Sequence, residues 1–334
     1  MIEANNYMRE LTVNFPNQLV EALEIAKKQS FKSPKHEIRN IVMCGMGGSG
    51  IGGRIVSQWL VDDLTVPVSF CQDYDLPNFV NEHTLFLASS YSGNTEETLM
   101  CLDEAIAKGA HVICVSSGGK LAQICEKNGF DCVMVPGGNP PRASLAYSLV
   151  QLVNILAELN MCPKQRVTEI QAGHDLVVAN QDEVRAEADR LTTALKGKIP
   201  VFYAANAYEG LTIRARQQFN ENSKLLALAN AIPEMNHNEL VGWGGGDSRF
   251  GVLFFDTKDL NERNRKRVEI TLDRIGRKTD TVLTVEAKGN SKIEKTIYLN
   301  NIIDWLSWNM AVTNGVDSVE IEVIEFLKGS LANL

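Results

Sequence analysis

Two polar runs in this chain of 334 residues have the composition of anion-binding turns. Residues 45–53 are rich in glycine, and residues 89–98 are rich in serine and threonine. Each run follows a short apolar segment that predicts a β-strand, and each precedes a segment with helical periodicity. Free backbone amides at the start of a helix attract phosphate, and glycine lets the backbone approach it closely. Both runs are therefore candidates for ligand binding.

The glycine-rich run allows three interpretations. Its glycines at positions 45, 47 and 50 also match the GxGxxG pattern of dinucleotide-binding folds, which requires an acidic residue at the end of the second strand. The acidic residues near that point lie before the second strand or beyond its end: Asp62, Asp63 and Asp73. A nicotinamide or flavin cofactor is therefore disfavoured. Anion binding and tight packing without a ligand both stay open.

The serine- and threonine-rich run favours phosphate binding over simple helix capping. A single hydroxyl is enough to cap the following helix, with Glu96 and Glu97 interacting favourably with its positive end. The run also contains Gly93, and it offers more hydroxyl side chains than capping needs: Ser89, Ser90, Ser92 and Thr95. Phosphate binding at the carboxyl edge of a parallel sheet explains this surplus.

A carboxylate and an imidazole in the second half of the chain could move protons. Glu221 lies on a predicted helix at 209–224, where its helical spacing places it on one face with Arg214 and two glutamines. The alternative is a solvated helix face on which Glu221 pairs with Lys224. His237 lies in a polar run, and its alternative is a histidine in a surface turn.

Four motifs together resemble one enzyme family. The pattern SxSGxT at 90–95 is similar to the phosphate loop of sugar isomerase (SIS) domains. The runs GMGGSGIGG at 45–53, NENSK at 220–224 and PEMNHNE at 233–239 resemble segments of the bifunctional phosphoglucose/phosphomannose isomerases. The resemblance covers most of the chain. It implies interconversion of glucose 6-phosphate, and of mannose 6-phosphate, with fructose 6-phosphate through a cis-enediol.

The resemblance also implies a role for individual residues. Glu221 would be the base that moves the proton between C1 and C2, and His237 would assist ring opening. Arg142, in the turn Pro-Pro-Arg, would lie near the sugar, and Lys328 would be the active-site lysine of the last helix; the alternatives are an exposed arginine and a cation at a helix C-terminus. The phosphate would be held by Gly48, Ser49, Ser90, Ser92 and Thr95.

The segment before the last helix departs from the family pattern. Ser318, Val319 and Glu320 stand where family members often have Pro-Thr-Pro. This stretch borders the sugar in the family and bears on the acceptance of both epimers, so the departure concerns mannose 6-phosphate directly. Two rival functions stay open: a non-catalytic SIS sensor of a sugar phosphate, and an SIS isomerase for another sugar such as an amino sugar or a pentose phosphate.

Alternating strand and helix patterns must position these residues. The chain predicts an α/β fold of two SIS-type three-layer αβα domains with mainly parallel sheets, at residues 1–160 and 161–334. A broken helix and a polar stretch place the linker near 160–165. Strands are expected at 40–44, 66–71, 84–90, 111–116 and 131–135, and then at 201–205, 251–256 and 281–285. Helices are expected between them, including 15–29, 51–60, 95–108, 209–224, 292–310 and 321–331.

Composition limits the partners and the location of the protein. The net charge is −8 and no long basic cluster occurs, so nucleic acid is not an expected partner. The seven cysteines lack CxxC spacing and are interpreted as reduced thiols, and no metal or other cofactor is expected. No signal peptide or membrane-spanning run is recognised, which favours the cytoplasm.

The resemblance implies a homodimer in which His237 reaches the partner's active site.

Overall fold

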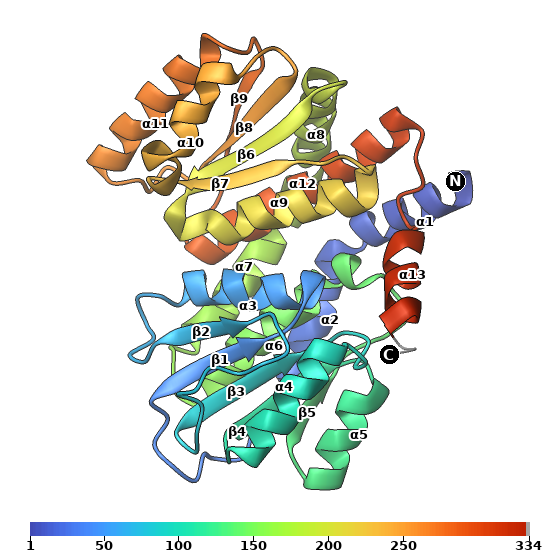
Figure 1. Cartoon of the computed structure of the whole chain (residues 1–334), viewed down its shortest axis with the longest axis vertical. Coiled ribbons are helices and arrows are strands. Elements are labelled where there is room, and N and C mark those ends of the chain that lie inside the picture. Colours follow the sequence, from blue (N-terminus) through green and yellow to red (C-terminus); the bar gives the residue numbers. More distant parts are fainter. Residues whose placement is uncertain (332–334) are drawn as a thin grey trace.

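Two parallel sheets organise the chain, one in each half (Figure 1). The computed structural model describes residues 1–331. The first sheet has the order β2-β1-β3-β4-β5, from β1 (Asn40–Cys44), β2 (Val68–Cys71), β3 (Thr84–Ser89), β4 (His111–Ser116) and β5 (Asp131–Met134). The second has the order β7-β6-β8-β9, from β6 (Ile199–Ala205), β7 (Leu228–Ile232), β8 (Phe250–Asp256) and β9 (Val282–Glu286). The predicted α/β class is confirmed.

Helices cover both faces of the first sheet. Successive residues of a strand point to opposite faces, and in β1 Ile41 and Met43 enter one apolar core while Val42 and Cys44 enter another. The first core lies under α2 (Phe15–Ala26), α3 (Gly47–Trp59) and α6 (Leu145–Glu158). The second lies under α4 (Glu96–Ala107) and α5 (Gly119–Asn128). Burial on both faces explains why these strands are continuous apolar runs.

The second sheet is also enclosed on both faces. One core joins it to α8 (Gln181–Leu195), α9 (Glu209–Ser223) and α12 (Lys292–Asn314). The other core contains Met235, Trp243 and Val268, from the short 3₁₀ helices η3 (Glu234–His237) and η4 (Trp243–Gly245) and from α11 (Glu262–Gly276). A short helix, α10 (Glu239–Gly242), lies between η3 and η4.

Two helices connect the cores of the two halves. Ile170 and Val177 of α7 (Gln165–Ala179) belong to the core of the first sheet, as do Ile293 and Ile297 at the start of α12. Later residues of α12, beginning with Tyr298, enter the core of the second sheet. The helix α12 therefore contributes side chains to both halves.

Most predicted elements are observed, and the exceptions have physical causes. The helix predicted at 51–60 begins earlier, at Gly47. Its start was not recognised in the sequence because glycine is a poor helix former. The sequence analysis missed β7, whose residues Leu-Ala-Asn-Ala-Ile are only partly buried, and α1 (Ile2–Val13). No helix among residues 1–331 is long and apolar enough to cross a membrane.

Candidate active site

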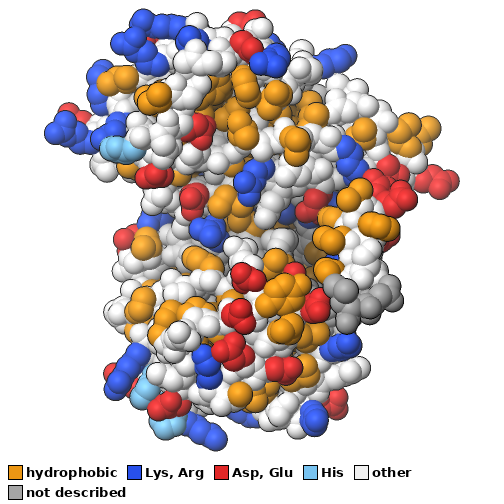
Figure 2. Space-filling model, in the orientation of Figure 1, with side chains coloured by type: hydrophobic (Ala, Val, Ile, Leu, Met, Phe, Trp, Pro, Cys, Tyr) orange, Lys and Arg blue, Asp and Glu red, His pale blue; other side chains and the backbone are white. Residues whose placement is uncertain are grey.

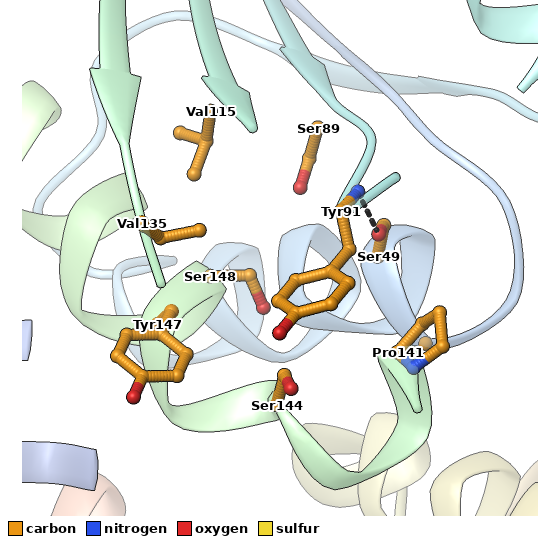
Figure 3. A pocket seen from close by; sticks show the side chains of 10 residues that line it. Ser49, Ser89, Tyr91, Val115, Val135, Pro141, Ser144, Tyr147 and Ser148 are labelled. Carbon is orange, nitrogen blue, oxygen red and sulfur yellow. Dashed lines mark hydrogen bonds between the residues drawn. The ribbon is translucent and has the colours of Figure 1, made fainter. Parts of the chain in front are cut away.

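The two predicted anion-binding turns meet at the carboxyl edge of the first sheet. The hydroxyl oxygen Oγ of Ser49 accepts a hydrogen bond from the backbone N–H of Tyr91 at 3.1 Å, as Figure 3 shows. A Cβ atom on Gly45 would lie 2.6 Å from the carbonyl oxygen of Ser89, closer than real Cβ contacts allow. Glycine at position 45 therefore lets the two turns touch.

Each turn leads into a helix whose first amides have no side-chain cap. The residue before α4 is Thr95, and its hydroxyl does not cap the helix; it shares a 2.9 Å hydrogen bond with the hydroxyl of Ser90. The residue before α3 is Met46, which has no capping oxygen. Ser92 is exposed, and its Oγ accepts from the N–H of Asn94 at 3.3 Å. Helical amides near both turns thus remain for an anion.

The hollow behind these turns is too small for a sugar. Its volume is about 10 Å³, room for roughly one water molecule. Figure 3 shows Tyr91, Ser144 and Tyr147 around it, below the contact between Ser49 and Tyr91. A ligand larger than a water molecule would therefore have to approach the turns from their open side.

Arg142 joins the first half of the chain to the helix that carries Glu221. Only 2% of its surface is exposed. Its Nε donates to Oδ1 of Asn222 at 2.7 Å, and its Nη1 donates to Oε2 of Glu221 at 3.2 Å. A Cβ on Gly48 would lie 3.1 Å from the backbone nitrogen of Arg142, so the glycine-rich turn packs directly against this arginine. The alternative of an exposed Arg142 is wrong.

Arg142 also holds the segment that departs from the family pattern. Its Nη2 donates to the carbonyl oxygens of Ser318 at 2.6 Å and Val319 at 3.1 Å. Asn5 of α1 fixes the same segment, since its Oδ1 accepts from the N–H of Ser318 at 3.0 Å. Burial lowers the pKa of Arg142, and the nearby Glu221 carboxylate opposes that shift. The departing segment thus lies beside the Arg142–Glu221 pair.

The Glu221 carboxylate faces Arg142 and not Lys224. Its side chain is 27% exposed, so one side of the pair is open to solvent. The ammonium of Lys224 donates to the backbone carbonyl of Glu221 at 2.6 Å and to that of Glu320 at 2.7 Å. Burial, and then the charge of Arg142, lower the pKa of Lys224. The alternative of a solvated Glu221–Lys224 side-chain pair is wrong.

A buried carboxylate that the sequence analysis missed supports this pair. Asp304 of α12 accepts from Nη2 of Arg214 at 3.0 Å and from Nε2 of Gln218 at 2.6 Å. The same Nη2 atom donates to the carbonyl oxygen of Arg142 at 2.6 Å. Burial raises the pKa of Asp304, and the Arg214 charge opposes this shift. The available signal was a polar stripe at helical spacing on an otherwise apolar helix: Asn300, Asp304 and Ser307.

His237 and Lys328 are not part of this cluster in a single chain. Both side chains are exposed, and neither has a hydrogen bond or ion pair with another residue in the range 1–331. His237 ends η3, next to α10, whereas Lys328 lies on α13 (Glu322–Leu331). Figure 1 shows α10 and α13 on opposite sides of the molecule. The structure therefore brings together Arg142, Glu221 and the two predicted phosphate turns, residues 45–53 and 89–98, but leaves His237 and Lys328 apart.

The fold defines the class of protein. Its overall structure is similar to the C-terminal domain of glucosamine-fructose-6-phosphate aminotransferase from Francisella tularensis, with a TM-score of 0.74 and 16% identity over 94% of this chain and 98% of that one. Residues 185–331 match the family model described as the bacterial phospho-glucose isomerase C-terminal SIS domain. The protein therefore has the SIS fold.

Sequence relatives identify the family within this class. A bifunctional phosphoglucose/phosphomannose isomerase from Caldicellulosiruptor bescii is 36% identical over 98% of this chain and 99% of its own length. Another from Thermoplasma acidophilum is 37% identical over 86% of this chain and 88% of its own. The chain belongs to the family of bifunctional phosphoglucose/phosphomannose isomerases, and it is a sugar-phosphate isomerase. The resemblance inferred from the motifs is confirmed.

Proposed function

We propose that this isomerase interconverts glucose 6-phosphate and mannose 6-phosphate with fructose 6-phosphate, and that Glu221 moves the proton between C1 and C2. The observation that carries the proposal is the 3.2 Å contact between Arg142 and Glu221, directly beside the glycine-rich turn. A phosphate held at Gly48, Ser49, Ser90, Ser92 and Thr95 would fix the far end of the open-chain sugar. Its reacting carbons would then lie near the carboxylate, which lowers the entropic part of the barrier.

Arg142 has a donor left for the reacting end of the sugar. A guanidinium has five N–H donors, and four hydrogen bonds to described residues are accounted for at Nε, Nη1 and Nη2. The fifth N–H is the second one on Nη1, the nitrogen that also donates to Glu221. We assign it to the oxygen that becomes negatively charged in the enediol, where a preoriented positive donor stabilises the transition state.

His237 and Lys328 require a second chain or a second element to complete the site. We propose a homodimer in which His237 enters the partner's site and assists ring opening, while Lys328 binds near the substrate. The exposed apolar side chains of α13 support an interface there, since Val323 is 80%, Phe326 76% and Leu327 57% exposed. Figure 2 shows uncovered hydrophobic side chains along the edge of the molecule where α13 lies.

The remaining proposals concern the chain as a whole. Two separate sheets support SIS-type domains at 1–160 and 161–334. The seven cysteines are all free thiols, which supports the reducing cytoplasm. We place the enzyme in central carbohydrate metabolism, in the glycolytic and gluconeogenic directions. Its catalysis is proposed to need no cofactor.

A substrate panel tests the proposed reaction. Purified enzyme is assayed with glucose 6-phosphate, mannose 6-phosphate, glucosamine 6-phosphate and a pentose 5-phosphate at matched concentrations. We expect fructose 6-phosphate from the first two, with solvent deuterium incorporated when the reaction runs in D₂O, because an enediol exchanges its proton. No fructose 6-phosphate from either hexose would overturn the proposal. Activity with glucose 6-phosphate alone would remove mannose 6-phosphate from it.

Mixed dimers test the contribution of His237 across the interface. Glu221→Gln and His237→Ala subunits are each expected to be inactive alone. If each site combines Glu221 of one chain with His237 of the other, random mixing rebuilds one intact site in each mixed dimer, or about a quarter of wild-type activity. Unchanged inactivity after subunit exchange, verified with differently tagged chains, would contradict the shared site.

A further inference from the structure

Three buried thiols gather below the phosphate turns, outside the site described above. The Sγ atoms of Cys44, Cys71 and Cys101 all lie within 4.8 Å of one another, and Cys71 and Cys101 are 3.3 Å apart. Each side chain is at most 4% exposed. We propose that these three thiolates bind a single thiophilic cation, Zn²⁺ or Cu⁺.

The fold forces the three residues together although they are far apart in the sequence. Cys44 ends β1 and Cys71 ends β2, and the two are paired neighbours in the parallel sheet, so their side chains point to the same face. Cys101 comes from α4, which packs on that face. The three sulfur atoms therefore converge from three different elements and not from one flexible loop.

The sulfur spacing suits one metal ion. A metal–sulfur bond of about 2.3 Å places the sulfurs of a trigonal or tetrahedral set about 3.8–4.0 Å apart. Cys71 and Cys101 would have to separate by less than 1 Å from their 3.3 Å contact, an estimate from the same bond length. Thiolates prefer soft ions such as Cu⁺ and Zn²⁺ over Mg²⁺ or Ca²⁺. The carbonyl oxygen of Asp73 accepts a hydrogen bond from Cys101 at 3.1 Å, and it is available as a fourth ligand to the ion.

A bound ion would tie together the elements that carry both phosphate turns. Gly45 follows Cys44 directly, and its N–H donates to the carbonyl oxygen of Cys71 at 3.3 Å. Cys101 belongs to the helix that begins after Thr95. Because the ion binds the folded chain, it would also raise the midpoint of thermal unfolding.

Metal titration of the full-length protein tests the proposal. The reduced chain is prepared without oxygen in a phosphine reductant and is titrated separately with ZnCl₂ and with Cu⁺, against a chromophoric chelator. We expect one ion per chain from at least one of the two metals, a thiolate-to-metal charge-transfer band with Cu⁺, and a higher unfolding temperature. The comparison of the two affinities decides whether the site prefers Zn²⁺ or Cu⁺.

Cysteine variants separate this site from other thiols. Cys71→Ser and Cys101→Ser should each lower the affinity at least tenfold and abolish the thermal shift, whereas Cys162→Ala, which removes a buried thiol elsewhere, should retain both. Circular dichroism of the metal-free variants checks that they fold. Unchanged metal affinity in both serine variants would overturn the proposal. The absence of bound metal from the reduced wild-type chain in both titrations would also overturn it.

Discussion

The phosphate turns and the Arg142–Glu221 cluster are built in opposite ways. The turns are made by short stretches of chain whose glycines and hydroxyls are close in the sequence, and their contacts use backbone atoms: Ser49 bonds to the N–H of Tyr91. The cluster joins charged side chains that are 79 residues apart for Arg142 and Glu221 and 90 apart for Arg214 and Asp304. The turns thus depend on local geometry, and the cluster depends on long-range packing.

This difference predicts different consequences of mutation. If the turns bind phosphate as proposed, a lost hydroxyl leaves neighbouring donors to hold it. A lost partner in the cluster leaves a charge that is buried without compensation, which costs several kcal/mol.

Replacing Glu221 by Gln should separate chemistry from binding. The amide keeps the shape of the side chain but cannot accept the proton, so kcat should fall by about 10³-fold or more. Affinity for an unreactive sugar-phosphate analogue, measured by calorimetry, should stay within a few-fold. Glu187→Gln, at a 24% exposed carboxylate on α8 that pairs with Arg190, is the matched control and should keep full turnover. Turnover near that of the wild type in Glu221→Gln would remove the assignment of the base.

Removing the buried carboxylate of Asp304 should destabilise the chain. Asp304→Ala leaves Arg214, whose side chain is 1% exposed, without its anion. We expect a loss of about 3–5 kcal/mol in the free energy of unfolding, measured with denaturant. The double variant Asp304→Leu with Arg214→Met should lose less than Asp304→Ala alone. A loss below 1 kcal/mol in Asp304→Ala would show that the cluster is not held by this pair.

Removing one hydroxyl from the phosphate turns should have a moderate effect. Ser49→Ala loses one hydrogen bond to a charged phosphate, about 1.5–3 kcal/mol, so KM should rise at least tenfold while kcat changes little. Ser57→Ala removes a hydroxyl from the same helix, where it bonds to the carbonyl of Arg54 at 2.8 Å. That control should leave KM unchanged. A fall in kcat without a change in KM would contradict the division between binding and chemistry.

Asp317 should give the smallest effect, visible as a difference in pH dependence. Burial raises the pKa of its carboxyl, but hydrogen bonds from the N–H groups of Glu320 and Val319 and the N-terminal ammonium outweigh burial and lower it. A lowered pKa contributes stability above the usual value of about 3.9, and that contribution is lost as pH falls through the lower value of the folded chain. Asp317→Asn should therefore destabilise the folded chain at pH 7, because the amide has no charge to interact with these groups. The difference should vanish in acid; a constant difference across pH would contradict this origin.

The two regions also differ in how far sequence reasoning could reach. The turns were predictable because glycine, serine and a following helix signal occur together, and the structure places Ser49 and Ser90 at the predicted edge of the first sheet. Glu221 and Arg142 were named from the family motifs, while their contact across 79 residues could be learned only from the fold. Asp304 was missed because the polar stripe that contains it does not reveal its partner, Arg214, which lies 90 residues away in the sequence. The cysteine cluster was missed because pairing of β1 with β2, and not sequence spacing, brings Cys44 and Cys71 together.

The long helix α12 has a consequence for how the protein can be divided. Its 23 residues span about 35 Å, with Ile293 and Ile297 in one core and Ile302 and Leu306 in the other. A fragment that ends at residue 160 would lack the helices α7 and α12 and would expose the apolar surface that they cover. The two halves should therefore melt in one calorimetric transition, and a gene cut between them should yield two insoluble pieces that regain solubility only when expressed together.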